Sequence, residues 1–174
     1  MSEPAYCPYY CEENIWHLAA DPRVGAGPRH VVLISNPGGT VALWGQRSGT
    51  EDTGGLVVWD YHVILTCAVG PDAMVWDLDT RLGAPVPLAV YLSQTFRGAP
   101  EPFHPMFRVT EADAFRSRFR SDRRHMREDD GAFMQPPPSW PAIGPGHTLP
   151  SWLDFDSEQP GRLLGLPGLV ALLG

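Results

Sequence analysis

The chain has 174 residues, 43% of them apolar, which fits one ordinary folded domain spanning residues 1–174. Its formal charge of −7 argues against binding to nucleic acid or to an anionic membrane, because both require clustered cations. The first residues carry neither a basic leader nor an apolar run, so we expect a cytoplasmic protein whose three cysteines stay reduced.

The amino-terminal pattern predicts a helix that begins near Cys11. Ile15 and Leu18 have helical spacing, and two carboxylates occupy the first turn, where the helix dipole favours them. The β-branched run His30–Ser35 follows and is stopped by turn residues. Val41–Trp44 then predicts a second short strand, so the two runs together are typical of a hairpin.

The middle of the chain predicts further strands and one more helix. These elements are strands over Val57–Thr66 and Ala73–Leu78, joined by the loop Cys67 to Asp72, a strand over Met106–Val109 and a helix over Glu111–Arg120. The proline-rich stretch Gln135–Pro145 is expected to be irregular. The apolar tail Leu163–Leu173 is too short to span a membrane and predicts a packed terminal segment. The order of elements favours an α+β fold.

Cys11 is placed to act as a nucleophile. A helix amino terminus favours the thiolate through its dipole, and its free N–H groups stabilise an oxyanion. The alternative is that Cys11 is an inert buried cysteine, which is common in proteins.

The predicted strand Val57–Thr66 places Asp60 and His62 on one face, because side chains alternate along a strand. If Thr66 pairs with Ala73 in an antiparallel hairpin, His62 lies directly opposite Asp77. Opposed residues have Cβ atoms about 4.5–5.5 Å apart, so the carboxylate can orient the imidazole toward a thiol. Two alternatives stay open: Asp79 is the orienting group, or Asp77 only caps the loop.

Three blocks of this sequence resemble the signature blocks of protein N-terminal glutamine amidohydrolases. They are Cys11-Glu12-Glu13-Asn14-Ile15-Trp16, Trp59-Asp60-Tyr61-His62-Val63 and Asp77-Leu78-Asp79-Thr80. The resemblance continues in order over most of the chain, through Ser121-Asp122-Arg123, His125-Met126 and Pro136-Pro137-Pro138, and Ser121–Arg123 with His125 suggests a pocket wall. Leu163 to Gly174 does not resemble the family's carboxyl-terminal segment.

The resemblance implies a papain- or transglutaminase-like α+β fold, in which an amino-terminal helix carrying the cysteine packs on a mainly antiparallel sheet. It also implies a Cys-His-Asp triad formed by Cys11, His62 and Asp77 in a single catalytic domain. Family members release ammonia from the side chain of an amino-terminal glutamine and leave glutamate, which in eukaryotes feeds a degradation pathway.

The corresponding hypothesis for this chain is hydrolysis through a thioester on Cys11. The expected partners are proteins or peptides with a free amino-terminal glutamine, and we expect a monomer that uses no metal and no organic cofactor. The substrate α-ammonium requires a carboxylate or backbone carbonyls, and Asp60 ranks before Glu12 as its candidate because Asp60 shares a face with His62.

Rival functions use the same residues. A thiol protease or an acyl transferase would need the same triad, and self-processing that exposes Cys11 is a further possibility. A catalytically silent module that binds protein amino termini belongs to a different class. A zinc site built from Cys7, Cys11, His62 and Cys67 lacks the paired short spacing that zinc ligands show.

Overall fold

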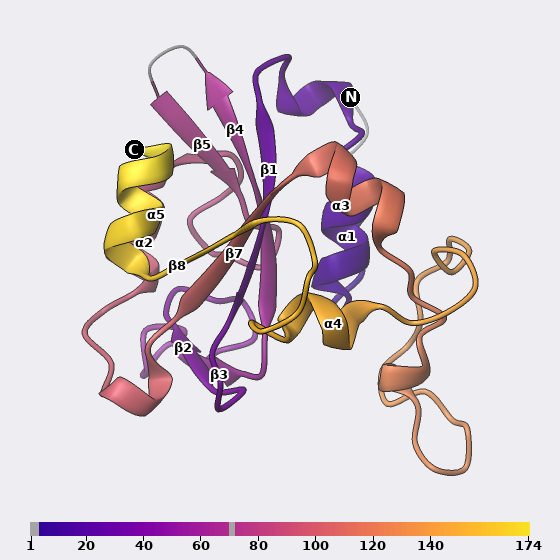
Figure 1. Cartoon of the computed structure of the whole chain (residues 1–174). Helices are drawn as coiled ribbons and strands as arrows, with labels where there is room; N and C mark the ends of the chain where they lie inside the picture. The colour runs from indigo at the N-terminus through magenta and orange to yellow at the C-terminus, as the bar shows by residue number, and fades with distance from the viewer. Residues whose placement is uncertain (1–3, 70–71) are drawn as a thin grey trace.

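The computed structural model describes residues 4–69 and 72–174, which form a six-stranded sheet with helices on both faces (Figure 1). The strand order is β6-β5-β4-β1-β7-β8, and every strand pairing among the described residues is antiparallel. The bounds of these strands are β1 Arg29–Ser35, β4 His62–Val69, β5 Asp72–Trp76, β6 Val86–Pro87, β7 Met106–Glu111 and β8 Arg162–Leu164. Two more strands, β2 (Val41–Leu43) and β3 (Val57–Trp59), pair only with each other.

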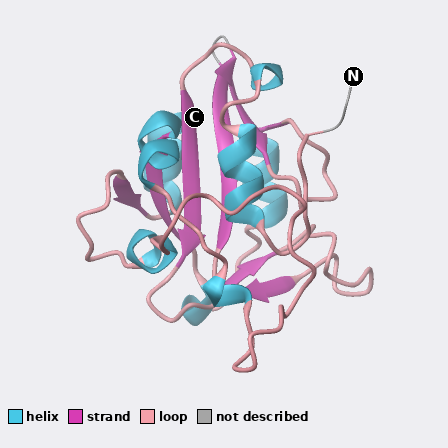
Figure 2. Cartoon of the chain, turned by 90° about the vertical axis from the view of Figure 1, so that its right-hand side faces the viewer, coloured by secondary structure: helices cyan, strands magenta, loops and turns pink. Residues whose placement is uncertain are grey.

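Helices α1 and α3 cover one face of the sheet, and α2 and α5 cover the other (Figures 1 and 2). The bounds of the α-helices are α1 Cys11–Leu18, α2 Leu88–Thr95, α3 Ala112–Arg118, α4 Leu149–Leu153 and α5 Leu166–Leu173. Short 3-10 turns occur at Pro22–Val24, Glu101–Phe103 and Arg124–Met126. Within the described ranges, none of these helices has the length and apolar character needed to cross a membrane.

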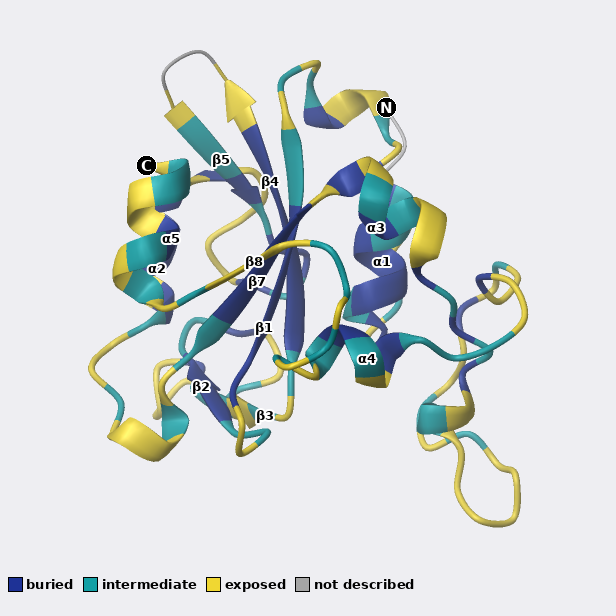
Figure 3. Cartoon of the chain, in the orientation of Figure 1, coloured by how far each residue is buried: buried dark blue, intermediate teal, exposed yellow. Residues whose placement is uncertain are grey.

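The two faces of the sheet follow directly from the alternation of side chains along the central strands. In β1, Val31 and Leu33 face α1 and α3, whereas Val32 and Ile34 face α2 and α5. All four are almost completely buried, since a strand with helices on both faces has no solvent side. Burial therefore concentrates along the central strands and the inner sides of the helices (Figure 3).

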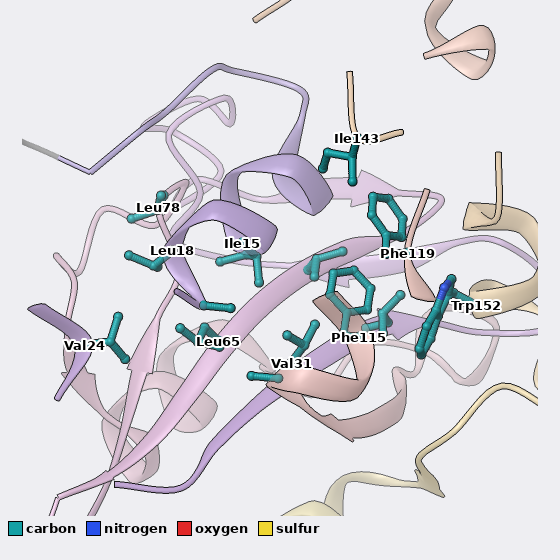
Figure 4. Close-up of a cluster of buried hydrophobic side chains, with 14 of the residues drawn as sticks. Ile15, Leu18, Val24, Val31, Leu65, Leu78, Phe115, Phe119, Ile143 and Trp152 are labelled. Atoms are coloured by element: carbon teal, nitrogen blue, oxygen red, sulfur yellow. The ribbon is translucent and has the colours of Figure 1, made fainter. Parts of the chain in front are cut away.

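The core beneath α1 and α3 is built from interlocking aromatic rings and aliphatic side chains (Figure 4). Phe115 of α3 stacks on Phe119 with 4.8 Å between ring centroids, and it meets the edge of Trp152 of α4 at 5.0 Å. All three rings are inaccessible to solvent. This packing fixes the face of the sheet on which α1, and therefore Cys11, is held.

Most of the predicted elements are confirmed, including the helix that begins at Cys11, the strand β1, the strand β7 and the helix α3. The α+β class is also confirmed, because an amino-terminal helix packs on a mainly antiparallel sheet, whereas the papain- or transglutaminase-like likeness stays a prediction. The tail was predicted to pack as a terminal segment, and α5 buries Leu169 against the sheet.

The predicted pairing of strands is wrong in two places. The first two strands do not form a hairpin, because β1 lies between β4 and β7 while β2 pairs with β3. In the β4–β5 hairpin, Thr66 pairs with Val75 and not with Ala73. The strands also extend farther toward the turn than the predicted loop Cys67 to Asp72 allows, and residues 70 and 71 lie outside the described residues.

The predicted continuous strand Val57–Thr66 is also wrong, because the chain leaves one sheet and enters the other at Asp60 and Tyr61. The Asp60 side chain accepts a hydrogen bond from the Tyr61 N–H at 3.0 Å, and its carbonyl accepts one from Ser35 Oγ. Asp60 therefore terminates β3 and does not share a strand face with His62.

Replacing Phe115 by alanine should lower the free energy of unfolding by about 3–5 kcal/mol, because it opens a cavity between Phe119 and Trp152. Urea denaturation followed by circular dichroism measures this change. The matched control is Val90→Ala on the exposed side of α2, which should shift stability by less than about 0.5 kcal/mol. Equal effects of the two substitutions would contradict the packing described above.

Candidate active site

A cavity of about 690 Å³ opens where the start of α1 meets the start of β4. Cys11 and His62 both line it, together with residues from the amino-terminal segment, the β3–β4 junction and the irregular segment after α3. The remaining lining residues are Tyr6, Pro8, Tyr9, Arg47, Ser48, Trp59, Asp60, Tyr61, Asp79, His125, Met126, Met134, His147, Leu149, Pro150 and Leu153. The structure thus brings the predicted nucleophile and the predicted base to one cavity.

Cys11 is the first residue of α1 and is half-buried. The side chain of Asn14 fixes this helix start, because it accepts a hydrogen bond from the Cys7 N–H and donates one to the Cys7 carbonyl, both at 2.9 Å. A hydrogen bond from the backbone N–H of Val63 reaches the Cys11 sulfur. The thiol therefore lies beside the residue that follows His62.

His62 and Asp77 form a buried hydrogen bond, with 2.9 Å between His62 Nε2 and Asp77 Oδ1. Each is about 1% exposed, so water does not compete for this contact. The ring of Trp59 packs against the imidazole, with 4.7 Å between centroids. Because Nε2 is engaged with the carboxylate, Nδ1 is the ring nitrogen left to act on another group.

Three further donors hold the Asp77 carboxylate in place. Its Oδ1 accepts a hydrogen bond from the Asp79 N–H at 2.9 Å, and its Oδ2 accepts from Tyr91 Oη at 2.9 Å and from Gln46 Nε2 at 3.3 Å. Gln46 is held beside Thr80 by an isolated antiparallel bridge. A buried carboxylate with this many donors stays charged and keeps one orientation.

The pKa values of His62 and Asp77 are set by their burial and by the charge that each places beside the other. Burial lowers the pKa of His62, but the charge and hydrogen bond of Asp77 outweigh it, so the pKa of His62 lies above its ordinary value. Burial raises the pKa of Asp77, but His62 and the other donors outweigh it, so the pKa of Asp77 lies below its ordinary value. The pair thus stabilises the imidazolium that forms when His62 accepts a proton.

The surroundings of the Cys11 thiol, in contrast, disfavour its charged form. Burial raises its pKa well above the ordinary value, and the charges of Glu12 and Asp79 add to this, while the Val63 N–H lowers it. The pKa of the thiol thus lies above its ordinary value although Cys11 begins a helix, a position that was expected to favour the thiolate. A base is therefore needed to remove the thiol proton.

The two residues predicted to bind substrate lie in different surroundings. Asp60 lines the cavity, but it is exposed. Glu12 is completely buried beside the cavity, where its Oε2 accepts a hydrogen bond from Tyr61 Oη at 3.0 Å and its Oε1 lies 3.2 Å from His125 Nε2. His125 in turn stacks on His147, and both rings line the cavity.

The second carboxylate of the first helical turn has a structural partner that sequence reasoning missed. Glu13 is buried and forms a two-point ion pair with Arg123, with Glu13 Oε1 to Arg123 Nε at 2.9 Å and Oε2 to Nη2 at 2.8 Å. Trp140 Nε1 also donates to Glu13 Oε2, at 2.9 Å. These bonds attach the irregular segment after α3, which was predicted as a pocket wall, to the start of α1.

His62, Asp77 and Asp79 present three ligand-type atoms within 4.8 Å of one another. Protein hydrogen bonds already join these side chains: His62 binds Asp77, and the Tyr6 hydroxyl binds Asp79 Oδ1 at 2.7 Å. Because protein groups already bind these polar atoms, we assign no metal to the three side chains. Tyr6, Gln46 and Tyr91 carried no pattern in the sequence that marked them as partners of these carboxylates.

The sequence matches the family model for N-terminal glutamine amidase over residues 6–171. The match therefore includes most of the tail, where no resemblance was expected. The chain is 41% identical over 171 residues to the protein N-terminal glutamine amidohydrolase of Drosophila pseudoobscura pseudoobscura, and 40% identical over 171 residues to that of Drosophila melanogaster. Each alignment covers 93% of this chain and 82% of the relative.

The raised pKa of His62 has a direct test by nuclear magnetic resonance. In the unsubstituted protein, His62 should titrate above the ordinary histidine value of about 6.5. In Asp77→Asn it should titrate below that value, because burial remains while the negative charge is lost. Asp72→Asn, at the exposed far end of β5, is the matched control and should leave the titration unchanged. An unshifted pKa in Asp77→Asn would contradict this account.

Arg123→Met should lower the free energy of unfolding by about 3 kcal/mol, because it leaves the buried Glu13 carboxylate without its ion partner. The double variant Glu13→Gln with Arg123→Met should recover part of this loss. Arg124→Met is the matched control, since its ion pair with Asp122 is exposed and should contribute little. Thermal and urea unfolding of the unsubstituted protein, Glu13→Gln, Arg123→Met and the double variant measure the coupling, and additive effects would contradict a direct ion pair.

Proposed function

Because the chain belongs to the N-terminal glutamine amidase family, we propose that it hydrolyses the side-chain amide of an amino-terminal glutamine to glutamate and ammonia. The single observation that supports this most is the cavity that is lined both by the helix-start thiol of Cys11 and by the His62 imidazole, which a buried carboxylate orients. This arrangement is suited to nucleophilic attack on an amide carbon.

In the proposed mechanism, His62 Nδ1 takes the proton from the Cys11 thiol as the sulfur attacks the glutamine δ-carbon. Asp77 holds the imidazole through Nε2 and stabilises the positive charge that forms on the ring. The raised pKa of the thiol makes this step depend on the base, and the raised pKa of His62 makes the base strong enough to serve.

The attack produces a tetrahedral oxyanion, which needs hydrogen-bond donors. The first N–H groups of α1 have no partner within the helix, and the N–H of Cys11 itself is the candidate donor. Collapse of this intermediate returns the proton from His62 to the leaving nitrogen, releases ammonia and leaves a thioester on Cys11. Water deprotonated by His62 then attacks the thioester and releases the glutamate side chain.

We also propose where the reaction takes place and which molecules take part in it. We place the enzyme in the cytoplasm as a monomer with one catalytic domain, 1–174, acting on proteins or peptides that carry a free amino-terminal glutamine. All three cysteines, Cys7, Cys11 and Cys67, are free thiols, which fits a reducing compartment. Asp60 remains a predicted contact of the substrate at the cavity opening, and Glu12 a predicted contact near the nucleophile.

The activity is tested with a short Gln-initiated peptide and its N-acetylated twin. The free peptide should release one ammonia and gain about one dalton without chain cleavage, whereas the acetylated peptide should react far more slowly. Cys11→Ala should lower turnover by at least about 1,000-fold and keep the fold, and Cys7→Ala is the matched thiol control that should stay active. Cleavage of an internal peptide bond would indicate a protease, and an active Cys11→Ala protein would refute the scheme.

A further inference from the structure

An enzyme that acts only on amino-terminal glutamine must recognise the α-ammonium, which an internal glutamine lacks. Four bonds separate the α-nitrogen from the amide carbon, and with bonds of about 1.5 Å an extended side chain spans roughly 4–5 Å. The group that binds the ammonium must therefore lie within the same cavity as Cys11 and His62, a short distance from both. A desolvated carboxylate is the strongest partner that a protein offers to an ammonium.

Glu12 does not meet this requirement in the structure. Its carboxylate is completely buried and is not part of the cavity lining. Tyr61 Oη donates to one of its oxygens, and the ring of His125 lies 3.2 Å from the other. Its Oε2 also lies 3.7 Å from the Cys11 sulfur, so Tyr61, His125 and the thiol already occupy the surroundings of this carboxylate.

Asp60 meets the requirement for binding the α-ammonium only in part. It lines the cavity, but it is exposed, and its Oδ1 already accepts a hydrogen bond from the Tyr61 N–H at 3.0 Å. Water screens an ion pair at an exposed carboxylate, so such a pair contributes little selectivity.

Asp79 is the cavity-lining carboxylate that is both desolvated and available. It is half-buried, and the Tyr6 hydroxyl donates to its Oδ1 at 2.7 Å, while its Oδ2 has no hydrogen-bond partner among residues 4–69 and 72–174. No arginine in this described part of the chain forms an ion pair with it. A carboxylate oxygen of Asp79 lies within 4.8 Å of a ring nitrogen of His62, so it is close to the residue proposed as the base.

The backbone around Asp79 holds the carboxylate in this position. Its N–H donates to Asp77 Oδ1 at 2.9 Å, and its carbonyl accepts from the Arg47 N–H at 2.8 Å. The residue is thus tied to the carboxylate that orients His62 and to Arg47, which also lines the cavity. Preorganisation of this kind strengthens binding, because little conformational freedom remains to be lost.

We propose that Asp79, rather than Asp60 or Glu12, binds the α-ammonium of the substrate and so makes the enzyme specific for amino-terminal glutamine. The inference rests on the proposed deamidation and names the residue that selects its substrate. Burial is the main cause that raises the pKa of Asp79 above its ordinary value, although the charges of His62 and Arg47 lower it, and an ammonium bound at Oδ2 would further favour the ionised carboxylate.

The test combines a substitution in the enzyme with the removal of one group from the substrate. One peptide begins with glutamine, and its twin begins with the des-amino analogue, 4-carbamoylbutanoyl, which keeps the amide but lacks the α-nitrogen. In the unsubstituted enzyme, removing the ammonium should lower kcat/KM by about 10- to 100-fold or more. In Asp79→Asn the two peptides should react at nearly equal rates, and Asp79→Glu should restore part of the preference.

Two controls separate a binding role from damage to the site. Asp72→Asn, an exposed aspartate of β5, should keep the full preference for the amino peptide. Alkylation of Cys11 by iodoacetamide needs no α-ammonium. The rate of this alkylation in Asp79→Asn therefore shows whether the thiol and His62 still react. Circular dichroism of the same variant checks the fold.

The outcomes are distinct. If the unsubstituted enzyme releases no ammonia from either peptide, the proposed function itself fails. If it does release ammonia but Asp79→Asn keeps the full preference for the amino peptide, only the assignment of Asp79 is overturned. A preference that is lost in Asp60→Asn or Glu12→Gln, and not in Asp79→Asn, would overturn it in favour of that residue.

Discussion

The buried hydrogen bond between His62 and Asp77 is the contact on which the rest of the site depends. A carboxylate without solvent is costly unless donors surround it, and here the donors come from three separate parts of the chain: Gln46 after β2, Tyr91 on α2 and the N–H of Asp79. Each of these parts must be in place for the charge on Asp77 to be tolerated. The central sheet and α2 therefore serve the chemistry by fixing one carboxylate.

The sequence was sufficient to predict this contact, although the pairing used to predict it was wrong. The observed register of β4 against β5 differs from the predicted one by two residues, and a shift of two keeps every side chain on its original face. Asp77 therefore stayed on the side of His62. It reaches the imidazole from the turn after Trp76, where the ladder has ended, and continuing the register would set Asp79 level with His62.

Other parts of the site cannot be predicted from the local sequence pattern. The break at Asp60 and Tyr61 interrupts a run that is continuous in β propensity, because hydrogen bonds from distant residues decide where β3 ends. Glu12 and Glu13 suit the first turn of any exposed helix, yet both are buried. The partner of Glu13 is Arg123, 110 residues away, and no feature within α1 indicates it.

The acidic groups around Cys11 impose a chemical constraint on the resting enzyme. Burial, Glu12 and Asp79 all raise the pKa of the thiol, so the cysteine is kept protonated although it begins a helix. A neutral thiol reacts slowly with oxidants and with adventitious electrophiles, because the thiolate is the nucleophile. In the proposed mechanism, reactivity then depends on His62 accepting the proton, and Asp77 raises the pKa of the buried imidazole for this step. The carboxylates that raise the pKa of the thiol therefore increase the dependence of this mechanism on the His62–Asp77 pair.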